Sequence, residues 1–243
     1  MPTDCQTEAP RLSLVIPCYN ESANLPRLVE RCAEAFAGED VEVVFVENGS
    51  TDNSREVLAR MLPDHSYARR VDVDVNQGYG FGILSGLRAA SAPYLGWTHA
   101  DLQADPGDAL KALDVIRAAG DGVVFIKGSR YGRALGAVAF TWGMAAFESI
   151  VLGARMWDIN AQPNIFPRSF FESWEDPPND FSLDLYAYYK AVHRGLPIRR
   201  LSVYFGPREH GVGHNDTLAA KLRLARRTMA YSVGLRRRLR SGN

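Results

Sequence analysis

The chain is poor in cysteine and has no excess of either charge. Its three cysteines, Cys5, Cys18 and Cys32, form an odd set without CxxC spacing, which argues against a disulfide framework and against a zinc site. Lysine plus arginine and aspartate plus glutamate number 28 each, so no overall charge points to nucleic acid. The N-terminus lacks the basic and apolar regions of a signal peptide. These absences favour a protein of the reducing cytoplasm.

Long hydrophobic runs are also scarce. One segment, 135–153, approaches the length of a membrane span, and Glu148 is its only charge. It also contains glycine, threonine and serine, and no second such segment follows. We expect a buried or interfacial helix here, with a membrane span as the alternative.

Acidic residues are absent from the last segment, 217–243. Apolar residues recur there at helical spacing, namely Leu218, Leu222, Ala225, Met229 and Val233. Basic residues flank them, namely Lys221, Arg223, Arg226 and Arg227. We therefore expect a basic amphipathic C-terminal helix over 216–243. It either lies on an anionic membrane leaflet or packs on the domain with a solvated basic face.

Apolar runs alternate with segments of helical periodicity along the rest of the chain. Strands are expected at 12–16, 41–46, 71–75, 94–98 and 123–126, the third of them at a sheet edge. Helices are expected at 25–36, 57–62, 83–90 and 109–119. This alternation predicts an α/β fold whose largely parallel sheet has helices on both faces. Ligands of such sheets bind at the carboxyl ends of the strands.

Polar clusters follow the first four expected strands, at 17–21, 47–52, 76–82 and 99–107. A dinucleotide-binding unit would need GxGxxG directly after the first strand, and that turn contains no glycine. In the fourth cluster, alternation along an extended segment brings His99, Asp101 and Gln103 to one spot. Their ligand types suit Mg²⁺ or Mn²⁺ held jointly with substrate phosphates. Asp105 is expected to cap the following helix, and Asp52 the helix after the second cluster.

Five ordered strings carry a family resemblance: LSLVIPCYNESANL, VVFVENGSTDNS, NQGYGFGILSGL, HADLQADP and KGSRYG. Over residues 11–215 they resemble the family 2 glycosyltransferases, most closely the branch typified by dolichol-phosphate mannose synthase and bacterial polyprenyl-phosphate sugar transferases. The resemblance implies a GT-A fold over 1–215, a UDP- or GDP-sugar donor, a divalent cation and inversion at the anomeric carbon.

The resemblance also implies roles for individual residues. Donor contacts are expected from Pro17, Tyr19, Glu21, Glu47, Asn48, Gly78, Gly80, Asp101, Arg130, Gln162 and Arg208. Glu47 and Asn48 stand where the family often has two aspartates, and the two glycines would let the backbone approach the donor. Asp101 and Gln103 match the family's metal-binding pair. His99 replaces the usual first aspartate, which predicts a preference for Mn²⁺ or a weaker dependence on metal.

The acceptor remains open between a polyprenyl phosphate and a hydroxyl. A hydroxyl acceptor needs a general base, for which Asp158 is the first candidate and Asp184 the second. A lipid phosphate is already anionic and needs none. Arg130 is expected to stabilise the charge of the leaving diphosphate. His210 and His214 are weaker candidates for the site.

Two other functions compete with a metal-assisted, inverting hexosyltransferase of glycan or glycolipid synthesis. One is a catalytically weak nucleotide-sugar-binding protein that retains the fold. The other is a sugar nucleotidyltransferase, whose usual glycine-rich basic turn after the first strand is absent. The expected location is cytoplasmic, with peripheral contact at the inner membrane face through the basic C-terminal helix.

Overall fold

A seven-stranded sheet organises the part of the chain that the computed structural model describes, residues 10–120, 122–208 and 218–241. The strand order is β3-β2-β1-β4-β6-β5-β7, and all neighbours are parallel except β6, which is antiparallel to β4 and β5. The strands are β1 (Leu12–Cys18), β2 (Val41–Asn48), β3 (Ala68–Val73), β4 (Tyr94–Trp97), β5 (Phe125–Tyr131), β6 (Asn164–Pro167) and β7 (Ile198–Tyr204). The predicted α/β fold with a mainly parallel sheet is confirmed.

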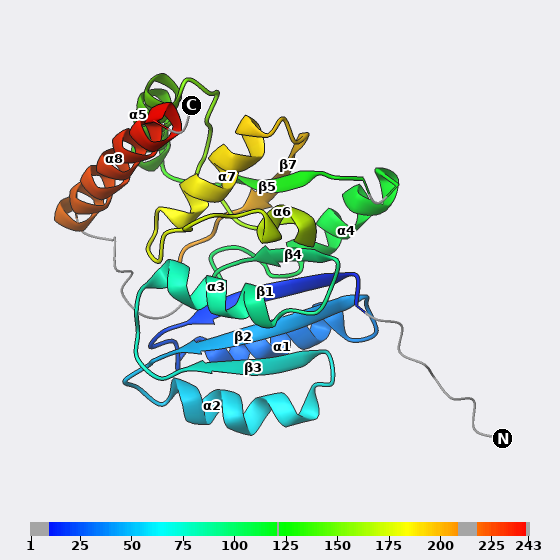
Figure 1. Ribbon diagram of the computed structural model, residues 1–243. Helices are drawn as coiled ribbons and strands as arrows, with labels where there is room; N and C mark the ends of the chain where they lie inside the picture. Colours follow the sequence, from blue (N-terminus) through cyan, green and yellow to red (C-terminus); the bar gives the residue numbers. More distant parts are fainter. Residues whose placement is uncertain (1–9, 121, 209–217, 242–243) are drawn as a thin grey trace.

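Helices cover both faces of this sheet, as predicted (Figure 1). They are α1 (Leu25–Phe36), α2 (Ser54–Met61), α3 (Tyr79–Ala89), α4 (Asp108–Ala118), α5 (Leu135–Leu152), α6 (Arg168–Glu172), α7 (Leu183–His193) and α8 (Leu218–Ser241), with a short 3-10 helix at Leu62–Asp64. Each face has its own apolar core. One core joins α1, α2 and α4 to the sheet, and the other joins α3, α6 and α7 to it.

Two strands differ from their predicted bounds more than the others do. β3 lies at the predicted edge, but it begins earlier and ends before the exposed Val75. Its charged residues are tolerated because Arg69 pairs with Glu42 and Arg70 with Asp72. β5 starts later and continues through polar residues to Tyr131, because β7 pairs with it along its whole length. Hydrophobicity alone predicted neither shift.

The helix predicted at 135–153 forms as α5, and of the two positions expected for it, buried or interfacial, the buried one is wrong. Only Ala145, Glu148 and Leu152 are buried, whereas Leu135, Trp142 and Ile150 are 88%, 61% and 75% exposed. By length and hydropathy α5 is also the single helix of the described residues that could cross a membrane. The alternative of an interfacial helix therefore fits its exposure better than a core position.

Helix α8 lies within the predicted C-terminal segment and packs beside α5 at one end of the molecule (Figure 1). Among the α8 side chains that the structure describes, the buried ones are Ala225, Thr228, Ser232 and Leu235. Helical spacing placed Val233 on the apolar face of this helix, but Val233 is 38% exposed, so the prediction is wrong at this residue. The expectations for the side chains of Leu218, Lys221 and Leu222 lie outside the described residues.

Candidate functional site

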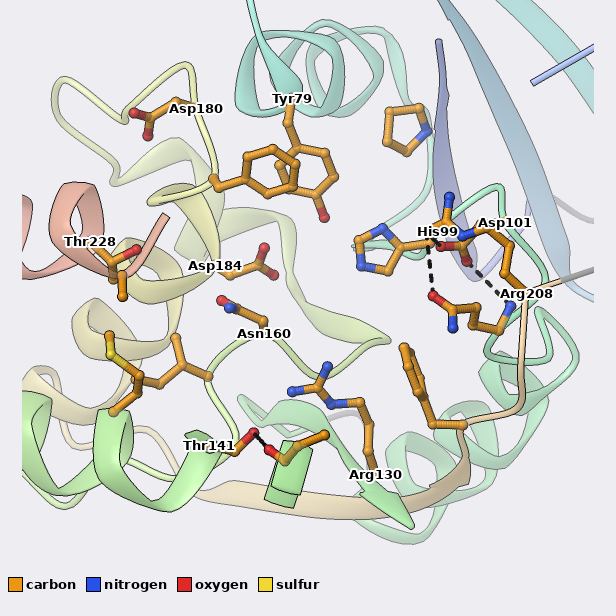
Figure 2. Close-up of a pocket in the computed structure, with 18 of the residues that line it drawn as sticks. Tyr79, His99, Asp101, Arg130, Thr141, Asn160, Asp180, Asp184, Arg208 and Thr228 are labelled. Carbon is orange, nitrogen blue, oxygen red and sulfur yellow. Dashed lines mark hydrogen bonds and ion pairs between the residues drawn. The ribbon is translucent and has the colours of Figure 1, made fainter. Parts of the chain in front are cut away.

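A cavity of about 780 Å³ lies where β1, β2, β4 and β5 end at their carboxyl termini, and α5 and α8 close its far side. Figure 2 shows its wall. It brings together most of the residues predicted for the site: Pro17, Tyr19, Glu21, Asn48, Gly78, His99, Asp101, Gln103, Arg130, Asp184 and Arg208. Four predicted residues do not line it, namely Glu47, Gly80, Asp158 and Gln162.

The end of the cavity near β2 holds Asn48, which is almost fully buried. Its Nδ2 donates to the carbonyl oxygen of Gly78 at 3.2 Å. Its Oδ1 is buried and has no hydrogen-bond partner among the described residues, so this acceptor is unsatisfied beside the cavity. Glu21 lines the same end. Burial raises the pKa of its carboxyl group, although a 2.6 Å hydrogen bond from Asn24 acts in the opposite direction.

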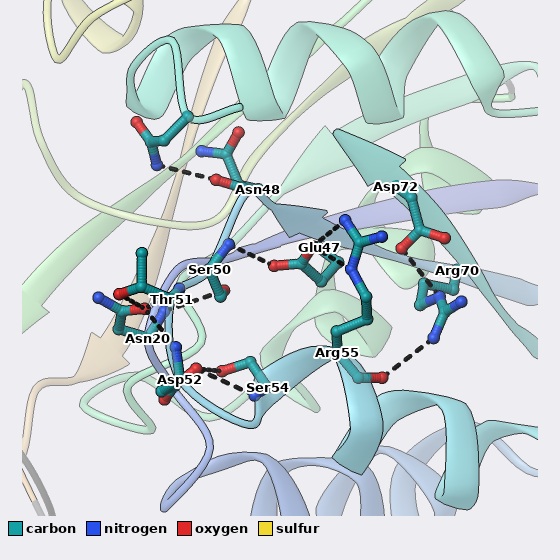
Figure 3. Close-up of polar contacts among 11 residues, drawn as sticks. Asn20, Glu47, Asn48, Ser50, Thr51, Asp52, Ser54, Arg55, Arg70 and Asp72 are labelled. Carbon is teal, nitrogen blue, oxygen red and sulfur yellow. Dashed lines mark hydrogen bonds and ion pairs between the residues drawn. The ribbon is translucent and has the colours of Figure 1, made fainter. Parts of the chain in front are cut away.

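Glu47 lies behind this wall and stabilises the turn after β2. Its fully buried carboxylate accepts hydrogen bonds from the Ser50 amide at 2.6 Å and from Arg55 at 2.9 Å (Figure 3). Burial alone would raise the pKa of Glu47, but these bonds outweigh burial and lower it. The structure thus gives Glu47 a structural role in the turn instead of a place on the cavity wall.

The neighbouring turns are cross-linked by two more polar side chains. Asn20 Oδ1 accepts from the Thr51 amide at 2.8 Å, which ties the turn after β1 to the turn after β2 (Figure 3). Asp52 accepts from the Ser54 amide at 2.9 Å, at the start of α2, and from the Ser22 amide at 3.1 Å. Asp52 therefore bonds the first turn of α2, close to its expected capping role.

Asp105 does not cap α4 with its side chain. The helix begins at Asp108, and Asp105 accepts instead from the Gly107 amide at 2.9 Å and pairs with Arg31 at 2.8 Å. The expected cap is therefore replaced by a turn before the helix.

Gly78 and Gly80 are required by the segment 178–180 that packs on them. A Cβ atom at Gly78, whose φ is 118°, would lie 2.4 Å from the Asn179 carbonyl oxygen. At Gly80 it would lie 2.5 Å from the Pro178 carbonyl oxygen. Both glycines therefore permit a close backbone approach. The approaching group is the protein's own chain.

The expected cation site contains a guanidinium group. Asp101 Oδ2 pairs with Arg208 Nη2 at 2.7 Å, and the same nitrogen lies 3.4 Å from Gln103 Oε1 (Figure 2). His99 stacks on Tyr79 with ring centroids 5.6 Å apart. In the described part of the chain no three His, Cys, Asp or Glu side chains form a metal-binding group. The oxygens of Asp101 and Gln103 converge on a cation, so they fit a divalent ion if Arg208 moves away.

Two arginines share one carboxylate on the opposite wall. Asp158 accepts from the Arg130 amide at 2.8 Å and from Arg130 Nε at 3.0 Å, and Arg133 Nη2 lies 3.7 Å from it. Burial would raise the pKa of Asp158, but the contacts with Arg130 outweigh burial and lower it. Two guanidinium groups against one carboxylate leave a net positive charge on this wall of the cavity. Asp158 orients Arg130 from behind the wall and does not reach the cavity as the expected general base would.

Asp184 lines the cavity, whereas Gln162 supports it from behind. Gln162 Nε2 donates to Asp184 Oδ1 at 2.6 Å and to the Tyr79 hydroxyl at 3.2 Å. Asp184 lies in the first turn of α7, where a helix N-terminus favours a carboxylate. Of the two acids considered as general bases, only Asp184 is therefore in contact with the cavity.

Several lining residues were not predicted from the sequence. Arg133 comes only three residues after Arg130, and Tyr79 directly follows Gly78, so their positions in the motifs could have suggested both. The side chains from α5 and α8, namely Phe140, Thr141, Met144, Ala145, Ala225, Arg227 and Thr228, carry no such signal. His210 and His214 lie outside the described residues.

Known proteins provide three comparisons. Residues 13–183 match the model of a family described as glycosyl transferase family 2. An undecaprenyl-phosphate 4-deoxy-4-formamido-L-arabinose transferase of Yersinia pestis is 30% identical over 123 residues, covering 49% of this chain and 38% of the relative. The chain thus spans about two fifths of the length of this curated relative.

Two solved structures are similar in fold. Glucosyl-3-phosphoglycerate synthase from Mycobacterium tuberculosis, solved with Mn²⁺, UDP and glucosyl-3-phosphoglycerate, has a TM-score of 0.70 at 20% identity, covering 93% of this chain and 80% of its own. A mannosyltransferase from Pyrobaculum calidifontis, solved with GDP-mannose and Mn²⁺, has a TM-score of 0.62 at 21% identity, covering 84% of this chain and 59% of its own. These likenesses show the GT-A fold.

Proposed function

Because the chain belongs to glycosyl transferase family 2, we propose that it transfers a sugar from a nucleotide-diphosphate sugar to a polyprenyl phosphate. One observation carries the proposal. One cavity joins polar strand ends suited to a nucleotide sugar with an arginine pair beside the largely apolar wall of α5. The name of the undecaprenyl-phosphate transferase relative supports the same acceptor class.

The donor would occupy the polar end. The unsatisfied Oδ1 of Asn48, once its side chain turns toward the cavity, can accept a hydrogen bond from a ring N–H of uracil or guanine. Glu21 can accept from a ribose hydroxyl. The donor diphosphate would then lie near Asp101 and Gln103. These two residues would hold a divalent cation, which supplies positive charge to the diphosphate when bound. Arg208, once displaced from Asp101, is close enough to contribute to the same charge.

The acceptor phosphate would bind at Arg130 and Arg133. The Nε of Arg133 is buried without a hydrogen-bond partner in the described residues, and Nη1 of the same side chain donates to Thr141 at 3.0 Å. A phosphate oxygen can accept from Arg130, and from Arg133 once its buried Nε is uncovered. The net positive charge of the pair favours a dianion. The adjoining wall contains Phe140, Met144 and Ile159, which suit the first isoprene units of a lipid.

The reaction then needs no strong base. An oxygen of the acceptor phosphate forms a bond to the anomeric carbon, and the bond from this carbon to the donor phosphate breaks. The electron pair leaves with the nucleoside diphosphate, and attack from the opposite side inverts the carbon. The protein orients the acceptor through Arg130 and Arg133 and excludes water with α5 and α8.

Asp184 supports a second candidate acceptor, a hydroxyl. It lines the cavity near the reaction centre, so it can accept the proton of an acceptor hydroxyl. This replaces Asp158, which is occupied by Arg130. With a lipid phosphate, Asp184 would instead hold a hydroxyl of the transferred sugar.

The location of the reaction would be the cytoplasmic surface of a membrane. Exposed apolar residues on α5 lie beside α8, whose Arg223, Arg226 and Arg227 are exposed. An apolar helix face next to basic residues suits an anionic lipid surface. The membrane contact predicted for the C-terminal helix alone would therefore involve both helices.

A transfer assay tests the function. Purified protein is incubated with Mn²⁺ and radiolabelled UDP- or GDP-sugars, with undecaprenyl phosphate or undecaprenol as acceptor. We expect label to enter the organic phase with the phosphate and not with the alcohol. Transfer to the alcohol alone would favour the hydroxyl acceptor, and binding of donors without any transfer would favour a nucleotide-sugar-binding protein.

A further inference from the structure

Three side chains form a row across the middle of the sheet. Asn164 of β6 is the direct register neighbour of Trp97 on β4 and of Lys127 on β5. Directly paired residues of neighbouring strands present their side chains on the same face. This row lies beneath the first turn of α7, where all three side chains connect to Asp184.

Donors from this row and from Gln162 converge on one oxygen of Asp184. Oδ1 accepts from Gln162 Nε2 at 2.6 Å, from Asn164 Nδ2 at 2.8 Å and from Trp97 Nε1 at 3.3 Å. None of these bonds uses Oδ2. These three bonds thus hold the carboxylate by one oxygen, and Tyr79 is a further side-chain partner of Asp184. Both residues line the cavity, where the carboxylate can meet a ligand (Figure 2).

Lys127 fixes the amide in this arrangement. The ammonium group is fully buried, and it donates to Asn164 Oδ1 at 2.6 Å and to the Ala161 carbonyl oxygen at 3.0 Å. Because an ammonium group only donates, Asn164 must turn its oxygen toward Lys127 and its NH₂ group toward Asp184. The same NH₂ group donates to Gln162 Oε1 at 2.6 Å, which orients the amide of Gln162 as well.

We propose that Lys127 is a positioning residue for Asp184 and acts through the side-chain amide of Asn164. A buried ammonium group without a carboxylate in direct contact is costly, and a methionine would fill the same space without a charge. The network gives a reason for its presence, since it determines which atoms face Asp184. The proposal rests on the proposed function only in treating Asp184 as a substrate contact.

The titration of Lys127 supports this link. Burial lowers the pKa of Lys127 to about 7. The negative charges of Asp184 and Asp158 raise this pKa, and the positive charges of Arg200 and Arg130 lower it further. Lysine is rare in this chain, with Lys111, Lys127, Lys190 and Lys221 as its four members. Each can therefore be followed separately by NMR with labelled lysine.

The first test measures the link without any substrate. Lysine signals are assigned by Lys→Arg changes at the three other positions, and the Lys127 signal is titrated in wild type, Asp184→Asn and Asp180→Asn. Asp180 also lines the cavity, but it pairs with Arg227. We expect Asp184→Asn to lower the titration midpoint of Lys127 by about half a pH unit or more, and Asp180→Asn to leave it unchanged. Equal midpoints in all three proteins would overturn the proposal.

The second test is a double-mutant cycle in the transfer assay. Lys127→Met should lower kcat about tenfold with little change in the KM of the donor, because the amide is released while the donor end is intact. The double variant of Lys127→Met and Asp184→Asn should lose no more kcat than Asp184→Asn alone. Ile126→Val, a core change on the same strand, is the control and should combine additively with Asp184→Asn. Additive loss from Lys127→Met would assign Lys127 a general structural role.

The two tests separate the inference from the function. If wild-type protein transfers no sugar, the proposed function fails while the lysine titration still reports the link. If wild type is active and the titration shows no link, the positioning role fails alone.

Discussion

Arg208 is the residue whose behaviour most affects cation binding. Its guanidinium group already contacts both Asp101 and Gln103, the two residues expected to hold the metal. A divalent ion must displace it, so the measured affinity for the ion includes the loss of a charge-assisted hydrogen bond. The apparent affinity of the free protein for Mn²⁺ should therefore be weak.

Arg208→Gln should tighten Mn²⁺ binding about tenfold, as expected from removing one hydrogen bond between charged groups. Electron paramagnetic resonance of free Mn²⁺ gives the dissociation constant directly. Arg31→Gln is the matched control, because Arg31 pairs with Asp105 in the same loop but outside the cavity. Equal or weaker Mn²⁺ binding by Arg208→Gln would show that Arg208 does not compete with the ion.

His99 should determine which ion is preferred. Imidazole is a better ligand for Mn²⁺ than for Mg²⁺, and the ring is held near the cavity by stacking on Tyr79. We expect faster transfer with Mn²⁺ than with Mg²⁺ in wild type, and a smaller difference in His99→Asp. Initial rates over a range of each ion measure this. Equal rates with the two ions in wild type would contradict the role of His99.

At the scale of helices, the pairing of α5 with α8 depends on a buried acid. Glu148 of α5 has no exposed surface, and it accepts a hydrogen bond from Ser232 of α8. Burial raises the pKa of Glu148 to about 7, against which the bond from Ser232 acts weakly. The folded protein therefore holds a proton that the unfolded chain releases near pH 4.5.

The contribution of Glu148 to stability must then fall as pH rises between about 4.5 and about 7, and it becomes constant above that range. Glu148→Gln removes this dependence. Its free energy of unfolding should exceed that of wild type by about 3 kcal/mol above pH 7, at roughly 1.4 kcal/mol per unit of pKa difference. Urea unfolding at several pH values measures the gap. Glu56→Gln, on the exposed side of α2, is the control. If the free energies of unfolding of Glu148→Gln and wild type differ by the same amount at every pH in this range, the raised pKa of Glu148 is contradicted.

The elements themselves were predictable to different degrees. The strands with continuous apolar runs, such as 41–46, were predicted nearly at their bounds because local hydrophobicity decides them. The polar half of β5 was not, because its strand geometry depends on pairing with β7, almost 70 residues later in the chain. The contact of α5 with α8 likewise depends on residues more than 80 positions apart, such as Glu148 and Ser232.

Residues of the site were predicted correctly where a sequence motif contains them. They were predicted wrongly where contacts in the folded chain determine the position of the side chain. Asp101 and Arg130 line the cavity as their motifs indicated. Asp158 seemed a free carboxylate in the sequence, yet its oxygens bind Arg130. Glu47 seemed a donor contact, yet Arg55 and Ser50 occupy it. In each case the partner is a residue whose contact no spacing rule specifies.

At the scale of the whole molecule, the α5 and α8 end should face a membrane. Ile150→Glu places a charge on the exposed apolar face of α5 and should reduce cosedimentation with vesicles containing anionic lipid at low salt. Val75→Glu, at a residue 69% exposed beyond the edge strand β3, is the matched control and should bind as wild type does. Equal loss in both variants, or no loss in either, would argue against this orientation.

The central claim is that Arg130 and Arg133 receive the phosphate of a lipid acceptor. The most direct measurement compares the KM for undecaprenyl phosphate in wild type, Arg133→Met and the control Arg117→Met, an exposed change on α4. We predict a KM for the acceptor raised about tenfold or more in Arg133→Met, with the KM for the donor unchanged and the control equal to wild type. An unchanged KM for the acceptor in a folded Arg133→Met protein would contradict the account.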